Sequence, residues 1–161
     1  MFYQRFTFKI GPLVAFEADN ALLGLFFASD GDCPSLHDGT KRETPLLAEV
    51  GRQLTEYFAG TRREFDLPLI QCGTEFQRRV WAELKKIPYG KTISYGELAK
   101  KIGSPKAARA VGGANNKNPI AIVVPCHRVI GSGGALVGYA AGVDKKRFLL
   151  ELERRVVAES R

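Results

Sequence analysis

The sequence is poor in residue types that define several classes of protein. Its three cysteines among 161 residues lie far apart and form no disulfide framework, which favours a reducing cytoplasm. The longest strongly apolar run, Ala21–Ala28, is far shorter than the roughly 18 residues that a membrane span needs. The amino end alternates charged and aromatic residues, unlike a signal peptide. We therefore expect a cytoplasmic protein that is not bound to a membrane.

Charge is distributed unevenly along the chain. The formal net charge is +7, but residues 1–68 carry 7 Lys and Arg against 10 Asp and Glu, whereas residues 69–161 carry 17 against 7. The strongly basic second half favours a polyanionic partner such as nucleic acid, although many basic domains bind none. The change in composition, with Pro68 at its end, predicts two domains, 1–68 and 69–161.

Residues 1–68 have the pattern of a small α+β unit. Alternating apolar and polar residues over 5–10 predict a strand, and Leu13–Glu17 and Leu22–Phe27 predict two more. Thr44-Pro45 is typical of a helix start, and Gly60 is expected to end that helix. No residue in this half indicates a chemical function.

Residues 69–161 have a mostly helical pattern. Capping boxes at Thr74–Gln77 and Ser94–Glu97 each predict the start of a helix. Gly103 should end the second helix, and Ser104-Pro105 should begin the next. Two short helices joined through glycine are the signature of a helix-turn-helix.

The chain beyond these helices contains an apolar run and a Gly-rich loop. Pro119–Val124 predicts a strand, and Gly131–Gly142 predicts a loop. Asp144 is expected to cap a last helix whose apolar face includes Leu149 and Leu152.

The second helix of the expected helix-turn-helix has few long side chains. Arg109 is the one long polar residue within a stretch of Ala and Gly that follows Lys106. Helices that read the major groove do so with long polar side chains, so this helix can read little sequence. Two interpretations remain open. The small residues either form a tight helix–helix contact inside the protein, or they let the helix enter the minor groove with Arg109 reaching into the duplex.

Cys126 is the best-placed nucleophile in the sequence. It follows an apolar run and a proline, and His127 and Arg128 come directly after it, which favours the reactive thiolate. Adjacent residues of an extended segment point to opposite faces, so contact between the cysteine and the histidine through a water is an alternative to a direct pair. Cys33 and His37 supply only two ligands, too few for a closed zinc site. We expect no metal and no cofactor.

A series of short motifs in the second half carries a family resemblance. They are, in order, Gly73-Thr74, Phe76-Gln77, Val80-Trp81, Ala108–Gly112, Asn118-Pro119, Pro125–Val129 and Gly138-Tyr139. In this order and spacing they strongly resemble the methylated-DNA–protein-cysteine methyltransferases, also called O6-alkylguanine-DNA alkyltransferases. The resemblance covers about residues 70–153, whereas residues 1–68 match only in length and helix position.

The resemblance implies both a fold and a reaction. The fold is α+β, with an N-terminal ribonuclease-H-like α/β domain and a mostly helical C-terminal domain that contains the helix-turn-helix. The implied partner is double-stranded DNA that contains O6-alkylguanine. The damaged base is flipped out, and its alkyl group moves irreversibly from O6 to Cys126, once per molecule. A monomer is implied, and side-by-side binding on DNA is left open.

The resemblance also implies catalytic roles for matching residues. His127 would act as the base for Cys126, through a water, and Glu153 would orient His127 in a relay of the Ser-His-Asp kind. Tyr95 would donate to N3 of the departing guanine. Asn118 would hold the turn that leads from the reading helix to the active-site segment.

Further residues are implied in binding DNA and the base. The expected DNA contacts are Tyr95, Ala107, Ala108, Arg109, Ala110, Gly112, Gly113 and Arg128. Arg109 would fill the gap that the flipped base leaves, whereas Arg128 has an internal ion pair as its alternative role. The expected walls of the base pocket are Tyr95, Val129, Tyr139 and Ala140. The backbone N–H of Ala140, where many members have Ser, would donate to O6.

Three other functions fit parts of this pattern. Alkyltransferase-like proteins bind damaged DNA without an acceptor cysteine, and the presence of Cys126 argues against that function. A cysteine hydrolase would need a separately placed histidine, and His37 is the only other one in the sequence. The Ala- and Gly-rich helix disfavours a sequence-specific regulator.

Overall fold

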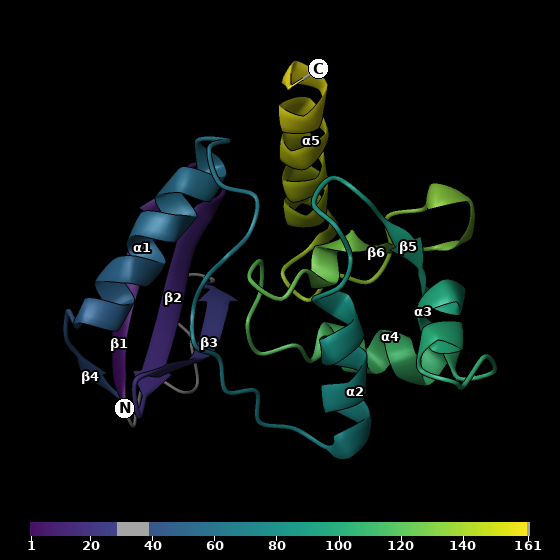
Figure 1. Cartoon of the computed structure of the whole chain (residues 1–161), viewed down its shortest axis with the longest axis horizontal. Helices are drawn as coiled ribbons and strands as arrows, with labels where there is room; N and C mark the ends of the chain where they lie inside the picture. Colours follow the sequence, from purple (N-terminus) through teal and green to yellow (C-terminus); the bar gives the residue numbers. More distant parts are fainter. Residues whose placement is uncertain (29–38, 161) are drawn as a thin grey trace. The chain divides into compact units, whose positions relative to one another are not determined.

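The chain divides into two compact units in the computed structural model, which describes residues 1–28 and 39–160 (Figure 1). Unit 1 comprises Met1–Cys72 together with Pro119–Ala121, and unit 2 comprises Gly73–Asn118 and Ile122–Arg161. The chain therefore returns to unit 1 for a short segment between two stretches of unit 2. No pattern in the sequence indicates this return. The content of Gly, Pro, Asp and Ser predicts a loop over residues 29–41, and most of this range lies outside the described residues.

Unit 1 is built on a four-stranded sheet with the strand order β3-β2-β1-β4. Strands β1 (Phe2–Phe8), β2 (Gly11–Ala18) and β3 (Ala21–Phe27) pair antiparallel in sequence, which confirms the predicted strands. The short β4 (Thr40–Lys41) runs parallel to β1. Asp19 and Asn20, with φ angles of 52° and 56°, form the tight turn between β2 and β3.

The outer edge of β3 is paired with two other segments of unit 1. Leu22 donates its backbone N–H to Pro68 O at 2.8 Å and accepts from Ile70 N at 3.0 Å. Leu25 donates to Pro119 O at 2.9 Å and accepts from Ala121 N at 3.0 Å. These bonds satisfy backbone groups of an edge strand that would otherwise be open to other chains.

Helix α1 (Pro45–Phe58) lies against the sheet (Figure 1). Thr44 caps it as predicted, because its hydroxyl oxygen accepts from Leu47 N at 3.1 Å. The same hydroxyl donates to the buried carboxylate of Glu17 at 2.6 Å. The cap therefore also satisfies a charge that the sheet brings into the interior.

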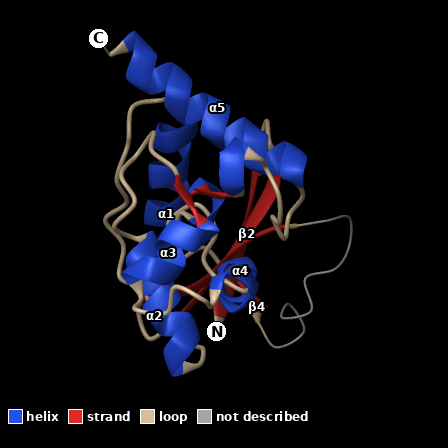
Figure 2. Ribbon diagram, turned by 90° about the vertical axis from the view of Figure 1, so that its right-hand side faces the viewer, coloured by secondary structure: helices blue, strands red, loops and turns tan. Residues whose placement is uncertain are grey.

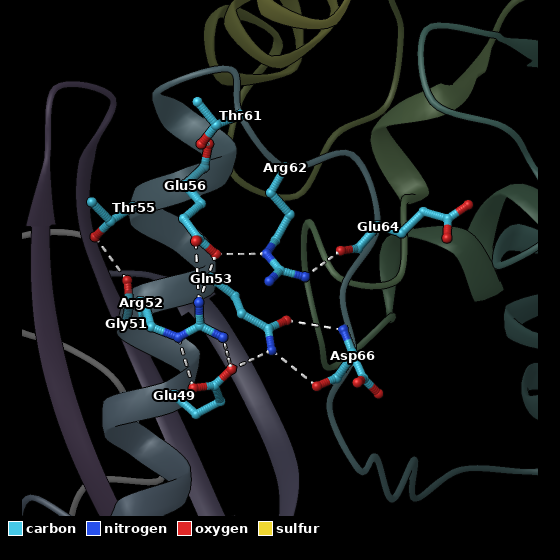
Figure 3. A network of polar contacts seen from close by, with 10 residues as sticks. All are labelled: Glu49, Gly51, Arg52, Gln53, Thr55, Glu56, Thr61, Arg62, Glu64 and Asp66. Atoms are coloured by element: carbon cyan, nitrogen blue, oxygen red, sulfur yellow. Dashed lines mark hydrogen bonds and ion pairs between the residues drawn. The ribbon is translucent and has the colours of Figure 1, made fainter.

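A polar network ties the chain that leaves α1 back to the helix (Figure 3). The buried amide of Gln53 donates to Asp66 O at 3.0 Å and accepts from Asp66 N at 2.9 Å. Arg62 pairs with Glu56 at 2.9 Å. Residues 62–66 are thereby held along α1 without regular secondary structure.

Unit 2 is mostly helical (Figure 2), with α2 (Glu75–Leu84), α3 (Tyr95–Lys101), α4 (Ala108–Asn116) and α5 (Val143–Glu159). The predicted capping box begins α2, since Thr74 Oγ1 accepts from Gln77 N at 3.1 Å and Thr74 N donates to Gln77 Oε1 at 3.0 Å. Strands β5 (Ile93–Ser94) and β6 (Val129–Ile130) form a short parallel pair. Within the described ranges, no helix has both the length and the apolar character that crossing a membrane requires.

Two helices of unit 2 begin at other residues than the sequence suggests, α4 later and α5 earlier. Residues 104–107 form a turn closed by Ala107 N and Ser104 O at 2.8 Å, so α4 begins at Ala108 rather than at Ser104-Pro105. Asp144 lies in the first turn of α5 instead of at its cap. The cap position belongs to Gly142, whose φ of 106° suits glycine.

The apolar run Pro119–Val124 is not a strand. Only Ile120 forms a β-bridge, with Leu25, and Ile122 has a φ of 70°, which turns the chain away from an extended path. Asn118 Nδ2 donates to Val124 O at 2.8 Å and closes the segment as a loop. Burial, rather than strand pairing, accounts for the apolar side chains here.

Gly51 provides a test of the packing between α1 and the sheet. Alanine usually stabilises a helix by about 1 kcal/mol over glycine, but a Cβ at this position would lie 2.5 Å from Cε1 of Phe6. We predict that Gly51→Ala lowers the free energy of unfolding by about 1–3 kcal/mol, because the Phe6 ring must move. Urea denaturation measures the change. In a Phe6→Ala background the same substitution should be neutral or stabilising, and a stabilised Gly51→Ala single variant would contradict the packing described.

Candidate active site

Cys126 lies in a turn of 3-10 helix, η2 (Cys126–Arg128), and not on an extended segment. The turn is closed by Arg128 N and Pro125 O at 3.1 Å. The side chains of Cys126, His127 and Arg128 are all directed inward, with exposed fractions of 6%, 0% and 6%. The alternation expected for an extended chain does not apply, because the three residues are helical.

His127 is paired with Glu153 of α5, as the resemblance implied. Their Nε2 and Oε2 atoms are 2.7 Å apart, and both side chains are fully buried. An ionised carboxylate only accepts hydrogen bonds, so Nε2 carries the proton and Nδ1 presents its lone pair. The buried Nδ1 has no hydrogen-bond partner within residues 1–28 and 39–160. The ring is therefore oriented so that the lone pair of Nδ1 is available to accept a proton.

Arg128 holds the other side of the same carboxylate. Its Nε lies 2.8 Å from Glu153 Oε1 and its Nη2 lies 3.1 Å from Oε2, a bidentate pair, while Nη1 donates to Ile87 O at 2.8 Å. Gly90 N also donates to Glu153 Oε1, at 3.1 Å. The enclosed guanidinium does not fit the expected DNA contact, because Glu153 and Ile87 use its donors. Arg128 is instead an internal ion-pair partner.

The charges of this cluster are fixed by its burial and its pairing. Burial alone would raise the pKa of the Glu153 carboxyl, but hydrogen bonds from His127 and Arg128 and the positive charge of Arg128 outweigh it and hold that pKa well below its usual range. Burial lowers the pKa of His127, partly opposed by Glu153. The imidazole is therefore neutral at pH 7 and able to accept a proton at Nδ1.

The Cys126 thiol has a raised pKa, although three neighbouring groups favour its ionised form. Burial raises its pKa, whereas hydrogen bonds from Asn118 and Tyr139 and the charge of Lys146 act in the opposite direction. Asn118 has a second contact at Val124 O and so lies at the turn that the resemblance implies for it. The structure therefore brings Asn118 and Tyr139 to Cys126.

Lys146 is a residue of this site that the sequence analysis missed. Its side chain is fully buried, and Nζ donates to Val129 O and, at 3.0 Å, to Val137 O. The sequence does indicate a buried position for this residue, because Lys146, Leu149 and Glu153 share one face of α5 at spacings of three and four. A charged residue on the inward face of a helix indicates a buried charge that needs partners.

Tyr95 begins α3 and lies beside the loop that follows β6. Its hydroxyl donates to Val137 O at 2.9 Å and lies 3.2 Å from Gly138 O. Lys146 Nζ is 5.7 Å from the centre of the Tyr95 ring. Of the other expected pocket residues, Val129 and the Tyr139 hydroxyl are buried and Ala140 is exposed. No described contact places Ala140 beside Cys126.

Helix α4 has one buried and one exposed face. Val111, Ala114 and Asn115 are buried, whereas Arg109 and Gly113 are exposed. A tight internal contact therefore accounts for only the inner face of the helix. The exposed face borders a shallow hollow of about 250 Å³, lined by Thr74, Phe76, Gln77, Ala110, Gly113, Ala114 and Lys117. Cys126 does not line this hollow.

No metal-binding cluster is present in the part of the chain that the structure describes, since no three His, Cys, Asp or Glu side chains there could hold an ion. Cys33 and His37 lie outside the described residues. Cys72 is an exposed free thiol.

Comparisons with known proteins match both units of the chain. Residues 75–155 match the family model of the 6-O-methylguanine DNA methyltransferase DNA-binding domain, and residues 1–71 match the model of the ribonuclease-like domain of the same family. This chain belongs to the 6-O-methylguanine DNA methyltransferase family. The two matches confirm the predicted fold class.

Relatives of this methyltransferase align along nearly their whole length. A methylated-DNA--protein-cysteine methyltransferase of Methanosarcina acetivorans is 50% identical over 153 residues, covering 95% of this chain and 98% of the relative. The constitutive enzyme of that name from Bacillus subtilis is 46% identical over 157 residues, with 95% of each chain covered. The expected enzyme class, a methylated-DNA–protein-cysteine methyltransferase, is confirmed.

Solved structures of family members have the same fold. The crystal structure of Mycobacterium tuberculosis O6-methylguanine methyltransferase has a TM-score of 0.89 and 48% identity, covering 95% of this chain and 92% of that one. A crystal structure of Mycobacterium tuberculosis OGT in complex with DNA has a TM-score of 0.89 and 46% identity, with 97% and 94% covered.

The depressed pKa of Glu153 leads to a testable pH dependence. A carboxylate with a lowered pKa stabilises the fold fully above its unfolded pKa of about 4.3, and this contribution is lost as the pH falls below that value. We expect Glu153→Gln to unfold more easily at pH 7, by about 3–5 kcal/mol, because Arg128 loses its counter-charge. Its stability should then change less than that of the wild type between about pH 6 and pH 3.

Urea denaturation at several pH values tests this expectation. Glu151→Gln is the matched control, because Glu151 is exposed on the same helix. Its free energy of unfolding should change with pH as that of the wild type does. If the free energy of unfolding changed equally with pH in Glu153→Gln and in the wild type, the Glu153 carboxylate would not be held ionised.

Proposed function

We propose that this chain repairs double-stranded DNA by moving a methyl or larger alkyl group from O6 of guanine to Sγ of Cys126. The observation that carries the proposal is the buried Cys126-His127-Glu153 series, in which Nδ1 of a neutral imidazole has no partner among the described residues. Family membership supports DNA repair by alkyl transfer. The complex of the Mycobacterium tuberculosis protein with DNA supports DNA as the partner.

The transfer begins with removal of the thiol proton. His127 Nδ1 takes this proton from Cys126, through a water or directly, and Glu153 stabilises the imidazolium that forms. The thiolate attacks the alkyl carbon, so an S–C bond forms while the C–O6 bond breaks and its electron pair passes to the guanine. Tyr95 then donates its proton to N3 of the departing base. Its hydroxyl must first leave Val137 O, its acceptor in this structure.

The position of the cysteine favours base flipping. Cys126 is 6% exposed, so a base stacked inside a duplex would not reach its sulfur, and the damaged nucleotide must leave the stack. The exposed, nearly bare face of α4 suits close approach to the minor groove, and Arg109 is the side chain long enough to fill the vacated space. Phosphate contacts by the basic second half would then supply affinity with little sequence preference.

Because Cys126 would itself accept the alkyl group, each molecule would act once. A thioether is not a leaving group for any nucleophile described in this site, so Cys126 would remain alkylated after one transfer. No cofactor takes part in this scheme. The chain would act as a monomer on DNA, and the scheme does not depend on neighbouring copies.

Intact-mass measurement tests the acceptor. After incubation with a duplex that contains O6-methylguanine, we expect the mass to rise by one methyl group in place of one hydrogen, and peptide mapping should place the label on Cys126. Cys126→Ala should retain DNA binding and acquire no label, whereas the control Cys72→Ala should be labelled like the wild type. An unmodified wild-type mass, or a label elsewhere, would contradict the proposal.

Arg109→Ala tests the flipping step. We expect it to slow repair of duplex DNA more than reaction with the free modified base, because the free base needs no extrusion. Lys106→Ala is the control for a basic side chain near the same helix and should mainly lower the salt dependence of binding, by a slope of about one. Single-turnover rates with the two substrates measure the difference. Equal slowing on duplex and free base would remove Arg109 from this step.

A further inference from the structure

Asn115 is a buried polar residue that the proposed reaction does not yet use. It lies on the inward face of α4, is 1% exposed, and donates Nδ2 to the backbone oxygen of Cys126 at 3.3 Å. Its Oδ1 is buried without a hydrogen-bond partner in the described part of the chain. An unpaired buried acceptor destabilises a fold, so packing alone does not account for an amide at this position.

The same amide reaches Tyr95. The Tyr95 ring lies over Gly112, where an added Cβ would be 3.7 Å from ring atoms Cδ1 and Cε1. Asn115 is three residues further along the helix and therefore on the same face. Burial raises the pKa of the Tyr95 hydroxyl, and a hydrogen bond from Asn115 acts in the opposite direction, as expected when the amide donates to the phenol oxygen.

These contacts explain why Oδ1 of Asn115, and not Nδ2, lacks a hydrogen-bond partner. An asparagine amide has two N–H bonds to donate. Nδ2 donates one to the Cys126 carbonyl, and the second is the group that can donate to the Tyr95 hydroxyl, whose pKa Asn115 lowers. With the amide in this orientation, Oδ1 is left without a hydrogen-bond partner among the described residues. The orientation of the amide is thus set by two groups that flank the reacting sulfur.

We propose that Asn115 is a positioning residue for alkyl transfer, which holds the Tyr95 hydroxyl beside Cys126 and donates Nδ2–H to the phenol oxygen as the phenol proton leaves. The inference rests on the proposed function, in which Tyr95 protonates the departing guanine. When the proton passes from Tyr95 to N3, negative charge develops on the phenol oxygen. A hydrogen bond to a charged oxygen is stronger than one to a neutral hydroxyl, so Asn115 binds the transition state better than the ground state.

The charged and titratable groups around the phenol are consistent with this role. Lys146 Nζ lies 5.7 Å from the ring centre, and Cys126 is close enough to act on Tyr95 electrostatically. The thiolate that His127 generates would oppose negative charge on the phenol oxygen, but it becomes a neutral thioether as the S–C bond forms. Lys146 and Asn115 therefore both favour transient negative charge on the Tyr95 oxygen.

A double-mutant cycle tests whether Asn115 acts through the Tyr95 hydroxyl. The first-order rate of methyl transfer is measured at saturating duplex DNA for the wild type, Asn115→Leu, Tyr95→Phe and the double variant. We expect Asn115→Leu to slow transfer about 10- to 100-fold, because it loses a hydrogen bond to a developing charge. In the Tyr95→Phe background the same substitution should change the rate less than about threefold.

Stability separates this role from a structural one. Leucine has a similar size and removes the unpaired oxygen together with the donor, so the Tm of Asn115→Leu should stay within about 3 °C of the wild type. Asn116→Leu is the matched control, the same substitution at the next, exposed position of α4, and should slow transfer less than about threefold. If Asn115→Leu does not fold, Asn115→Ala takes its place in the cycle.

The outcomes distinguish the inference from the function on which it rests. Wild-type methylation of Cys126 together with equal slowing by Asn115→Leu in both backgrounds, or with no slowing at all, would overturn the inference alone. Absence of wild-type methylation would overturn the proposed function itself. Slowing that disappears in the Tyr95→Phe background, with an unchanged Tm, would support the positioning role.

Discussion

The carboxylate of Glu153 holds together the parts of unit 2 on which the site depends. It binds His127 and Arg128 of η2 and the backbone N–H of Gly90 while projecting from α5, so three segments far apart in the sequence meet at one charge. Arg128 is essential to this arrangement, because a buried carboxyl without a cation would take up a proton. An ionised Glu153 accepts from Nε2 of the imidazole and thereby leaves Nδ1 as the basic atom.

Burial keeps the remaining reactive groups neutral before the reaction. It raises the pKa of the Cys126 thiol and of the Tyr95 and Tyr139 hydroxyls, and it lowers the pKa of His127. In the proposed transfer, charge therefore has to develop during the reaction itself. The groups that can stabilise it, Lys146 above all, are already fixed by backbone carbonyls and need little rearrangement.

Local sequence signals predicted the elements that depend on neighbouring residues. The cap at Thr44, the capping box at Thr74 and the three antiparallel strands are confirmed, because caps and alternating faces are set within a few residues. The apolar run before Cys126 was misjudged as a strand, because periodicity does not distinguish pairing from burial in a loop. The amide of Asn115 and the amine of Lys146 were missed for a related reason, since the partners of a buried polar side chain come from distant segments.

The short return of the chain to unit 1 affects how this protein can be divided. Pro119–Ala121 pairs with Leu25 on the outer edge of β3, and only a few residues separate that pairing from Cys126. A fragment that starts near residue 73 would keep this segment but lose the strand to which it binds. Removal of unit 1 therefore also removes the strand that binds Pro119–Ala121. In a gene fusion, a truncation or a split reporter, its edge strand must remain with the cysteine.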